Sequence, residues 1–339
     1  MSQFEQVRLR FDPVAEDGTP PATELSAAAR IGNTLIAAGD EGGNLEVMTL
    51  RSAGWEQVAR VSLHDLIRLP ADKAVEIDIE GLAVEGDWLW VVGSHSLKRQ
   101  KPRGKSPRQD LNDLRVIDRE ANRFVLARLP LVRNKSGQTR LVARDGDRRP
   151  AMVEIGKRSS ALLSWLTEDP VLAPFLDTPS KENGLDVEGI AVDRNHVWLG
   201  LRGPVLRGHA IVLQLDLKAN KRDVLKAKKI DGTRRFRKYL LTLDGLGIRD
   251  LELDGNDLLV LTGPARITRW RDAVEAKGSE VVPEKNLEIF LELEAGESRN
   301  TPEAICRYGG GRLLVLHDNP SEERLSNDKR SIQGDVYKF

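Results

Sequence analysis

The sequence predicts an all-β fold, a β-propeller built from four-stranded blades. The first observation is a repeat: DIEGLAVEGDWLWVVG at 78–93 returns as DVEGIAVDRNHVWLGL at 186–201, and both contain Asp-x-Glu-Gly-(Leu/Ile)-Ala-Val. The second is that each copy is an apolar strand, a polar turn and another apolar strand, which is the pattern of a β-hairpin. The third is that the flanking segments supply further strands, with no long helical period between them.

Three weaker copies of the hairpin indicate how many blades to expect. When Gly263 is aligned with Gly93, one acidic position recurs in four of the five copies. The weaker copies are ELSAAARIGNTLIAAG (24–39), IRDLELDGNDLLVLTG (248–263) and TPEAICRYGGGRLLVL (301–316), and the residues at the recurring position are Ser26, Glu80, Glu188, Asp250 and Glu303. The repeat predicts five blades. Six is the alternative, because the 108 residues between Glu80 and Glu188 are twice the 54 between Ser26 and Glu80.

The ends of the chain and one internal segment complete the expected domain, a single propeller over residues 1–339. The last copy is followed by one strand, GDVYKF at 334–339, so the ring needs a strand from elsewhere. QVRLRF at 6–11 would pair beside it and close the ring without open edges. Residues 132–180 contain no copy of the motif, and the apolar pattern at 159–176 predicts short helical turns broken at prolines. We expect a partly helical insertion there.

Composition limits the partners and the compartment. The 52 Lys and Arg balance the 52 Asp and Glu, so no overall field favours nucleic acid or an anionic membrane. The basic run KRQKPRGKSPR at 98–108 contains no aromatic residue for base stacking, which argues against nucleic acid and favours a solvated loop or a protein-docking face. Cys306 is the single cysteine, and neither a signal peptide nor an apolar span is visible. These features predict a cytoplasmic protein that does not enter a membrane.

The repeated acidic position is the first candidate site. The first strand of each blade lines the channel of a propeller, so the repeat would bring four carboxylates together. Such carboxylates repel one another, and they must bind a cation such as Ca²⁺, pair with bases such as Arg202 and Arg249, or raise their pKa values. The alternative is structural: each acid would cap backbone amides of the neighbouring blade. The candidate metal ligands are Glu80, Glu188, Asp250 and Glu303.

The hairpin exits carry the candidate catalytic residues. Arg202 and Arg207 lie beside glycines in LRGPVLRGH and would bind a phosphate or carboxylate group, or would neutralise the acids. His95 and His317 occupy similar places after a second strand, and His95 is the candidate general base. No zinc-binding histidine spacing, nucleophile elbow, phosphate loop or dinucleotide fingerprint is present, so no cofactor is indicated beyond Ca²⁺ or another divalent cation.

The most specific segments resemble a known family. EGLAVEGDWLWVVGSHSLKR (80–99), NGLDVEGIAV (183–192) and above all GLRGPVLRG (200–208) are similar to one bacterial domain family of unknown function. A more distant resemblance, through the D-x-E-G-(I/L)-A motif, is to phytase-like and esterase-like propellers. The resemblance implies the propeller fold and no particular reaction.

Two functions are compatible with these features. The first is a binding or interaction module with an acidic channel mouth, whose partner is a protein or a small anionic ligand. The alternative is a metal-dependent hydrolase, of the Ca²⁺ type, that acts on an anionic ester in the propeller mouth. Metal content would separate the two.

Overall fold

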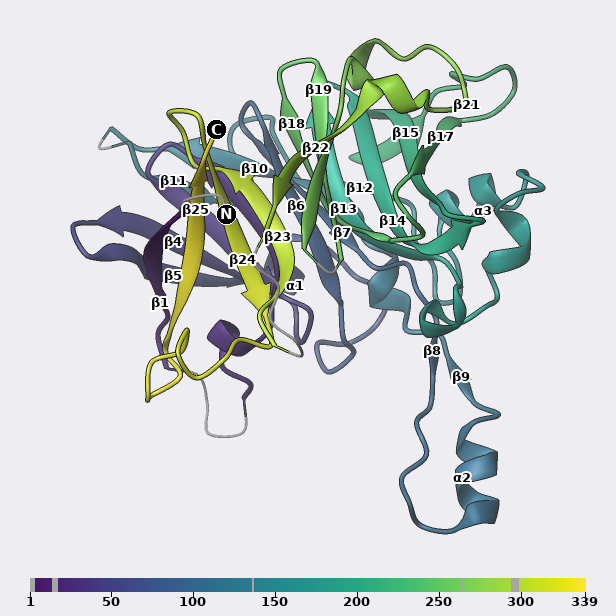
Figure 1. The fold of residues 1–339 in the computed structure, drawn as a ribbon, viewed down its shortest axis with the longest axis horizontal. Coiled ribbons are helices and arrows are strands. Elements are labelled where there is room, and N and C mark those ends of the chain that lie inside the picture. Colours follow the sequence, from purple (N-terminus) through teal and green to yellow (C-terminus); the bar gives the residue numbers. More distant parts are fainter. Residues whose placement is uncertain (1–3, 14–17, 136, 264, 294–298) are drawn as a thin grey trace.

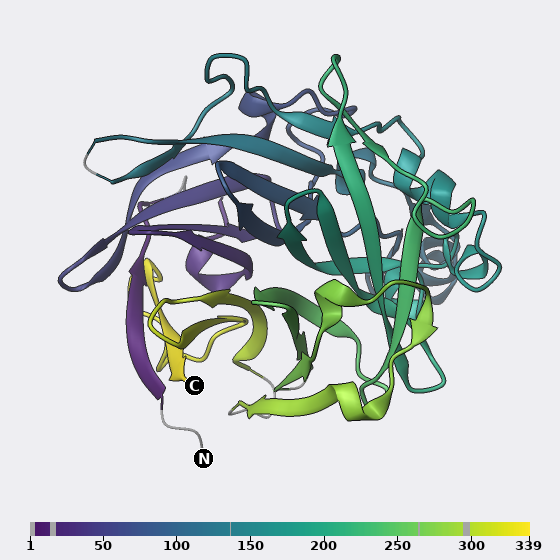
Figure 2. The ribbon, with the colours of Figure 1, turned by 90° about the horizontal axis from the view of Figure 1, so that it is seen from above.

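The fold is a β-propeller, in which sheets are arranged around a central axis (Figures 1 and 2). The computed structural model describes residues 4–13, 18–135, 137–263, 265–293 and 299–339. Within these ranges, five inner strands contact one another in a closed order, each lying against the next and the last against the first. These inner strands are β2 (Leu25–Ile31), β6 (Ile79–Glu85), β13 (Asp186–Asp193), β18 (Ile248–Asp254) and β23 (Thr301–Arg307).

Each inner strand forms the first arm of a hairpin, and further antiparallel strands follow outward. The strands that follow β2 are β3 (Thr34–Gly39), β4 (Asn44–Arg51) and β5 (Gly54–Ser62). Those that follow β6 are β7 (Trp88–Gly93) and β10 (Leu126–Arg133), with β11 (Thr139–Leu141) and β12 (Ala151–Val153) beside β10. Those that follow β13 are β14 (His196–Leu206) and β15 (His209–Ala219). β15 also pairs with β16 (Val224–Ala227) and β17 (Phe236–Thr242), and β17 pairs with β21 (Glu280–Val281). Those that follow β18 are β19 (Asp257–Thr262), β20 (Arg266–Trp270) and β22 (Leu287–Glu292). Because β12 pairs with β16 and joins two units into one sheet, the number of blades, five or six, stays a prediction.

The two ends of the chain meet in the last unit. Outward from β23 come β24 (Arg312–Asp318) and β25 (Ser331–Lys338), and β25 pairs along its length with the N-terminal strand β1 (Phe4–Arg10). At its C-terminal end β1 also runs parallel to β5, where Leu9 faces Trp55. The N-terminal strand therefore joins the last unit to the first.

Segment 132–180 contains β11, β12 and the helix α3 (Ala161–Leu166). The Ser160 hydroxyl accepts a hydrogen bond from the Leu163 amide and so caps the first turn of α3. The helix buries four apolar side chains against the sheet formed by the second and third units. Two further short helices are α1 (Leu63–Leu66) and α2 (Pro107–Asp113), and 3-10 turns occur at Pro21–Thr23, Ala121–Phe124, Ala173–Phe175, Ser180–Glu182, Ala273–Glu275 and Glu284–Asn286. In the parts of the chain that the structure describes, no helix has the length and hydropathy needed to cross a membrane.

The core lies between the sheets, where large aromatic side chains are fully buried. Trp90 and Trp198, which follow the repeated Glu by ten positions, lie on the second strands β7 and β14. Trp55 and Trp270 occupy the packing layers of the first and fourth units. The tryptophans that accompany the motif are thus core residues.

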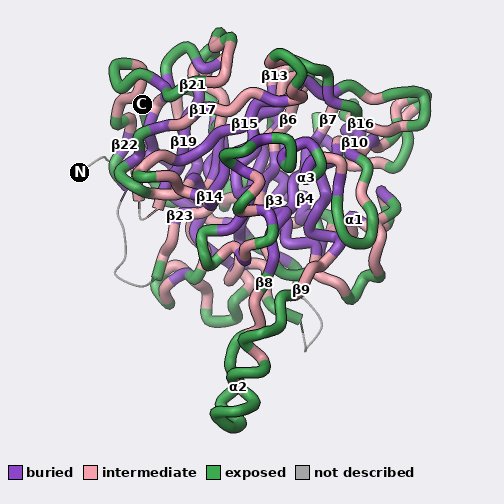
Figure 3. The backbone as a smooth tube through the Cα atoms, turned by 90° about the vertical axis from the view of Figure 1, so that its right-hand side faces the viewer, coloured by how far each residue is buried: buried purple, intermediate pink, exposed green. Residues whose placement is uncertain are grey.

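One segment leaves the body of the propeller. Residues 98–118, here called the arm, consist of the short strands β8 (Lys98–Arg99) and β9 (Ile117–Asp118) and a loop that carries α2. Figures 1 and 3 show the arm projecting from one end of the molecule, and Figure 3 shows that its surface is mostly exposed.

Candidate functional site

Each of the five inner strands carries a β-bulge near its start. At the bulge one residue has no partner on the second strand of the hairpin, and bulges of this kind redirect a side chain. All five bulge residues line one central cavity. They are Ser26, Glu80, Glu188, Arg249 and Glu303.

The bulges correct the alignment of the fourth repeat by one residue. Ile248 pairs with Thr262 and Asp250 with Leu261, so the position of Glu80 is taken by Arg249 and not by Asp250. The strand ends confirm this register, because Glu80 lies five residues before Glu85, the last residue of β6, as Arg249 does before Asp254, the last residue of β18. The alignment of Gly263 with Gly93 therefore placed the repeated position one residue too late, at Asp250 instead of Arg249.

Asp250 caps backbone amides, which is the structural role that the sequence offered as the alternative to metal binding. Its carboxylate is buried and accepts hydrogen bonds from the backbone amides of Leu251 (2.7 Å) and of Ile305 on the neighbouring inner strand β23 (2.8 Å). Asp250 is not among the residues that line the cavity. It connects two units and is separate from the candidate site.

The glycine of the motif allows neighbouring inner strands to approach. A Cβ atom at Gly189 would lie 2.9 Å from the Asp250 carbonyl carbon, and one at Gly81 would lie 2.8 Å from Ile190 Cγ2. Both distances are below normal van der Waals contact, so a larger residue would push the units apart. The Glu-Gly pair therefore places a carboxylate on the axis while keeping the strands around it close.

The cavity has a volume of about 780 Å³, and residues at the base of the arm are part of its lining. Eleven acidic and eight basic side chains line it. The acids are Glu24, Asp40, Glu41, Glu76, Asp78, Glu80, Asp118, Asp186, Glu188, Glu303 and Asp318. The bases are Lys98, Arg99, Lys101, Arg103, Arg123, Lys181, Arg202 and Arg249.

Two arginines neutralise part of the floor. Arg249 lies between two carboxylates, with its Nη1 2.8 Å from Glu303 and 3.3 Å from Glu188. Arg202, the extra residue of a second bulge on β14, pairs with Glu188 at 2.7 Å and with Asp186. Glu188 therefore contacts two guanidinium groups, which stabilise its charged form against the cost of burial.

A third arginine neutralises one side of the cavity. Arg123, on the 3-10 turn after the arm, pairs with Asp78 (2.6 Å), Glu76 (2.6 Å) and Glu120 (2.7 Å). Burial nevertheless raises the pKa of the Asp78 carboxyl to about 7. Arg123 is fully engaged by its own neighbours.

Glu80 differs from the other acids of the floor. Within the described residues it forms neither a hydrogen bond nor an ion pair, although Arg202 lies close enough to favour its charged form. Burial raises the pKa of the Glu80 carboxyl well above its usual range, and Asp78, Glu188 and Asp186 raise it further. Burial and neighbouring charges likewise raise the pKa of Glu303 to about 8.

The rim has an acidic and a basic side. The acidic side consists of Glu24, Asp40, Glu41 and Asp318, and burial together with mutual repulsion raises the pKa of Glu24 to about 8. No basic side chain of the described residues forms an ion pair with these four acids. The basic side consists of Lys98, Arg99, Lys101, Arg103 and Lys181, at the base of the arm and the 3-10 turn Ser180–Glu182.

The predicted catalytic residues are not brought together. Arg202 lines the cavity, whereas Arg207 is exposed in the turn between β14 and β15. His95 is buried outside the lining, with Nδ1 2.8 Å from the Gly93 carbonyl oxygen, and burial lowers its pKa to about 4. His317 is also buried outside the lining, and its Nε2 lies 2.9 Å from Asp335.

Most of the predicted metal ligands already have protein partners. No group of three or more His, Cys, Asp or Glu side chains within the described ranges is arranged to hold a metal ion. Of the four predicted ligands, Asp250 is occupied by backbone amides, and Glu188 and Glu303 are occupied by arginines. These three side chains would have to exchange their present partners to bind Ca²⁺, which stays a prediction from the sequence.

Sequence reasoning missed two parts of the site. Asp78 and Asp186 belong to the Asp-x-Glu-Gly motif, so the motif itself carried the signal that both line the cavity. Arg123 follows the arm and belongs to no repeat, and nothing in its sequence context indicates that it reaches the channel.

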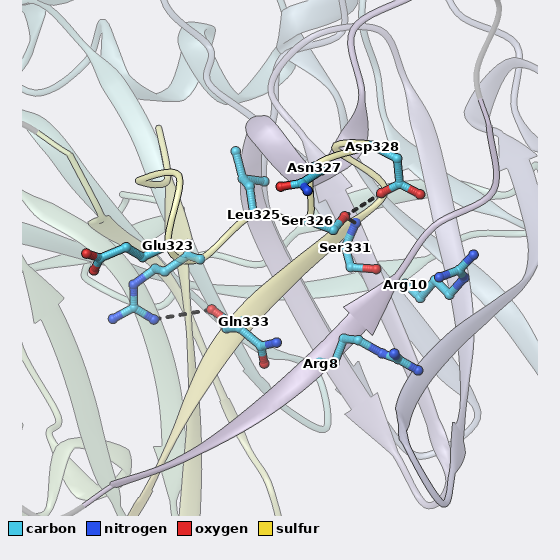
Figure 4. A pocket seen from close by; sticks show the side chains of 10 residues that line it. Arg8, Arg10, Glu323, Leu325, Ser326, Asn327, Asp328, Ser331 and Gln333 are labelled. Carbon is cyan, nitrogen blue, oxygen red and sulfur yellow. Dashed lines mark hydrogen bonds between the residues drawn. The ribbon is translucent and has the colours of Figure 1, made fainter.

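A second cavity, of about 450 Å³, lies on the outer strands β1 and β25 and the loop between β24 and β25 (Figure 4). Within its lining, the Ser326 hydroxyl forms a 2.5 Å hydrogen bond with Asp328, and Arg324 donates to the Gln333 carbonyl oxygen at 3.2 Å. Its lining side chains are exposed or half-buried except for Ser331. This cavity therefore lacks the buried charge of the central one.

Comparison with known proteins assigns the chain to a class, that of β-propeller domains without an assigned reaction. Residues 24–335 match the family described as "Protein of unknown function (DUF3616)". Because the match covers most of the chain, the protein belongs to this family. The search among curated proteins found no match.

Solved structures with a similar arrangement are only distantly related in sequence. Glutaminyl cyclase from Myxococcus xanthus is 9% identical, with a TM-score of 0.44 over 98% of this chain and 97% of that one. The β-propeller domain of Cps50 (Swd1) from Myceliophteria thermophila is 9% identical, with a TM-score of 0.35 over 93% and 83%. A PQQ-bound aldose sugar dehydrogenase from Streptomyces coelicolor is 8% identical, with a TM-score of 0.39 over 99% of both chains. These similarities are too low to indicate an activity.

Proposed function

We propose that the protein is a small-molecule binding propeller whose central cavity takes a ligand with a positively charged organic group, an ammonium or a guanidinium. The observation that carries the proposal is Glu80, a carboxyl on the cavity floor without an ion-pair partner among the described residues. Glu80 is half-buried at the cavity surface, and a carboxyl whose pKa is raised in this way either keeps a proton or is stabilised by a cation. A ligand ammonium would supply the missing positive charge.

The balance of charge around Glu80 supports the same ligand class. Acids outnumber bases in the lining, and the floor arginines are already paired with other carboxylates. An anionic ligand would have to displace these pairs, whereas a cation would relieve the repulsion among the remaining acids. An organic cation also suits the cavity better than a metal ion, since hydrogen bonds to an ammonium require fewer converging oxygens than Ca²⁺ does.

The metal-dependent hydrolase remains the second hypothesis from the sequence. A metal-dependent hydrolase would need at least three ligands around one metal ion. Of the four predicted ligands, Glu188 and Glu303 are paired with arginines and Asp250 accepts from backbone amides, so Glu80 is the one without such a partner among the described residues. The binding module is therefore the function that the geometry supports better.

Calorimetric titration at pH 7.5 tests the proposal, with putrescine and arginine as organic cations, CaCl₂ as the metal and inorganic phosphate as the anion. We expect heat of binding and a raised melting temperature with an organic cation, and neither with phosphate. Affinity should weaken as the pH falls from about 8 to 6, because protons compete with the cation for Glu80, Asp78 and Glu303.

Glu80→Gln keeps the shape of the side chain and removes its charge, so it should lower the affinity at least tenfold. Glu85→Gln is the matched control, because Glu85 lies on the same strand but at the turn, outside the cavity. Equal affinities of the two variants, or tight binding of Ca²⁺ alone, would contradict the proposal.

A further inference from the structure

The arm has an internal structure of its own. The carboxylate of Asp110 accepts hydrogen bonds from the amides of Arg103 (3.1 Å) and Gly104 (3.0 Å), and the Ser106 hydroxyl caps α2 through the Gln109 amide. At the base, Arg99 donates to the Leu114 carbonyl oxygen at 2.6 Å and pairs with Glu182. These bonds give the loop a defined shape.

The same segment buries almost nothing within the chain. α2 has no buried residue, and four aliphatic side chains of the arm are each at least 40% exposed. Ordering about twenty residues costs conformational entropy, which folded proteins normally offset by burying apolar surface. The exposed side chains are Leu111, Leu114, Val116 and Ile117.

The arm is also strongly basic. Residues 98–118 contain seven Lys and Arg against three Asp, in a chain whose net charge is zero, so the rest of the molecule is acidic. An acidic surface lies on the same face, since the acidic side of the cavity rim (Glu24, Asp40, Glu41 and Asp318) lines the cavity that the base of the arm also lines. Those acids have no basic partner in the described part of their own chain.

We propose that the arm joins two copies of this chain, with the basic residues of each arm placed against the acidic side of the partner's cavity rim. Complementary charges on one face allow a two-fold symmetric pair, in which the same contact is made twice. The aliphatic side chains of the arm would then be covered by the partner copy. The contact also completes the cavity wall with residues of the other copy.

A membrane or nucleic acid fits the arm less well. The arm contains no aromatic residue, whereas interfacial membrane anchors and single-stranded nucleic-acid sites rely on aromatic rings. An anionic membrane and a nucleic acid are both negatively charged, so neither would pair with the acidic side of the cavity rim. The basic arm and the acidic side of the rim, both present in this chain, have complementary charges, which favours a second copy of the chain as the partner.

Sedimentation equilibrium of the full chain between 1 and 100 µM tests the inference. We expect a mass twice that of one chain at the upper concentrations, and a dimer dissociation constant that rises at least tenfold between about 50 and 500 mM NaCl, because salt screens charge pairs. A monomer throughout the range overturns the proposal, whether or not the protein binds vesicles containing phosphatidylserine or single-stranded DNA.

Charge exchange identifies the surfaces. The triple variant Lys101→Glu, Arg103→Glu and Lys105→Glu should lower the fraction of dimer, and so should the double variant Asp40→Lys with Glu41→Lys. Mixing the two variants should restore association as a heterodimer, a result that misfolding cannot produce. Failure of the mixture to associate overturns the assignment of the surfaces.

Lys221→Glu with Arg222→Glu is the matched control, because this exposed basic pair lies in the turn between β15 and β16, outside the cavity lining. It should leave the dimer intact. Loss of the dimer in this control would show that net charge, and not the arm, drives association.

Discussion

The two best copies of the repeat, on β6 and β13, have the same motif but different electrostatic surroundings. Both place a Glu at a bulge and a Gly against the next inner strand. Glu188 contacts Arg202 and Arg249, whereas Glu80 forms no ion pair within the described residues. The difference has two sources: Arg202 comes from the second strand of Glu188's own hairpin, and Arg249 comes from the bulge of the fourth unit, where the first unit has Ser26.

This comparison separates what a repeat conserves from what it varies. The bulge recurs in all five inner strands, and the Glu-Gly motif adds the close strand approach in these two copies. The ion pairs of each Glu depend on residues outside the motif, on its own second strand and on the neighbouring unit, so Glu188 is paired and Glu80 is not within the described residues. Four predictions test this division, from the largest expected effect to the smallest.

The two glycines should respond unequally to substitution. Gly189→Ala places its Cβ against backbone atoms of Asp250 and Leu251, whereas Gly81→Ala meets mainly the side chains of Ile190 and Val92, which can shift. We expect about 2 to 3 kcal/mol of destabilisation for Gly189→Ala and about 1 kcal/mol less for Gly81→Ala. The reverse order in thermal or urea unfolding would contradict the close approach of β13 to β18.

Glu188→Gln should lower the free energy of unfolding by about 1 to 2 kcal/mol, because two half-buried guanidinium groups lose a charged partner that is itself buried. The loss stays below that of a fully broken pair, since Arg202 keeps Asp186 and Arg249 keeps Glu303. Urea unfolding at pH 7 measures it. An unchanged midpoint would mean that Glu188 is not a structural residue.

Stability should fall as the pH rises from about 5 to 8. Asp78 and Glu303 have pKa values of about 7 and 8 in the folded protein, above those of the unfolded chain. In this window the folded state holds more protons, so the stabilisation present below pH 4 is lost as the pH approaches 8. Urea midpoints at pH 5, 6.5 and 8 measure the slope, and Glu80→Gln should flatten it. A midpoint that rises over this range would show that these carboxyls are charged when folded.

Glu80→Gln should change stability at pH 7 by less than about 1 kcal/mol, and in the stabilising direction, because it removes repulsion and breaks no ion pair. The measurement is the same urea titration used for Glu188→Gln, so the two variants form a matched pair. A loss as large as that of Glu188→Gln would show that Glu80 is also structural, and would remove the main support for the ligand site.

The fold was predictable because its signals are local. The hairpin turns and the alternation of apolar residues indicated the inner strands, and the Asp-x-Glu-Gly motif marked two of the five bulges. The propeller fold and the family of unknown function are both confirmed. Ca²⁺ as a cofactor and a protein partner stay predictions from the sequence.

The details of the site were less predictable, because they depend on contacts between distant residues. Asp250 was placed one position out of register, since a bulge shifts pairing without leaving a mark in the sequence. Arg123 reaches the cavity from a loop that no repeat defines. Whether a Glu has an arginine partner depends on residues outside the motif, such as Arg202 on its own second strand and Arg249 on the neighbouring unit.

Pairing between β1 and β25 also has a consequence for biosynthesis. Strand β1 is translated long before its antiparallel partner and can pair with it only after Ser331–Lys338 have been made. Until then both strand edges flanking that junction are open, and folding requires a contact between the most distant parts of the chain, which is slow. The nascent protein therefore passes through a long interval in which aggregation competes with ring closure, and dependence on chaperones should be greatest during that interval.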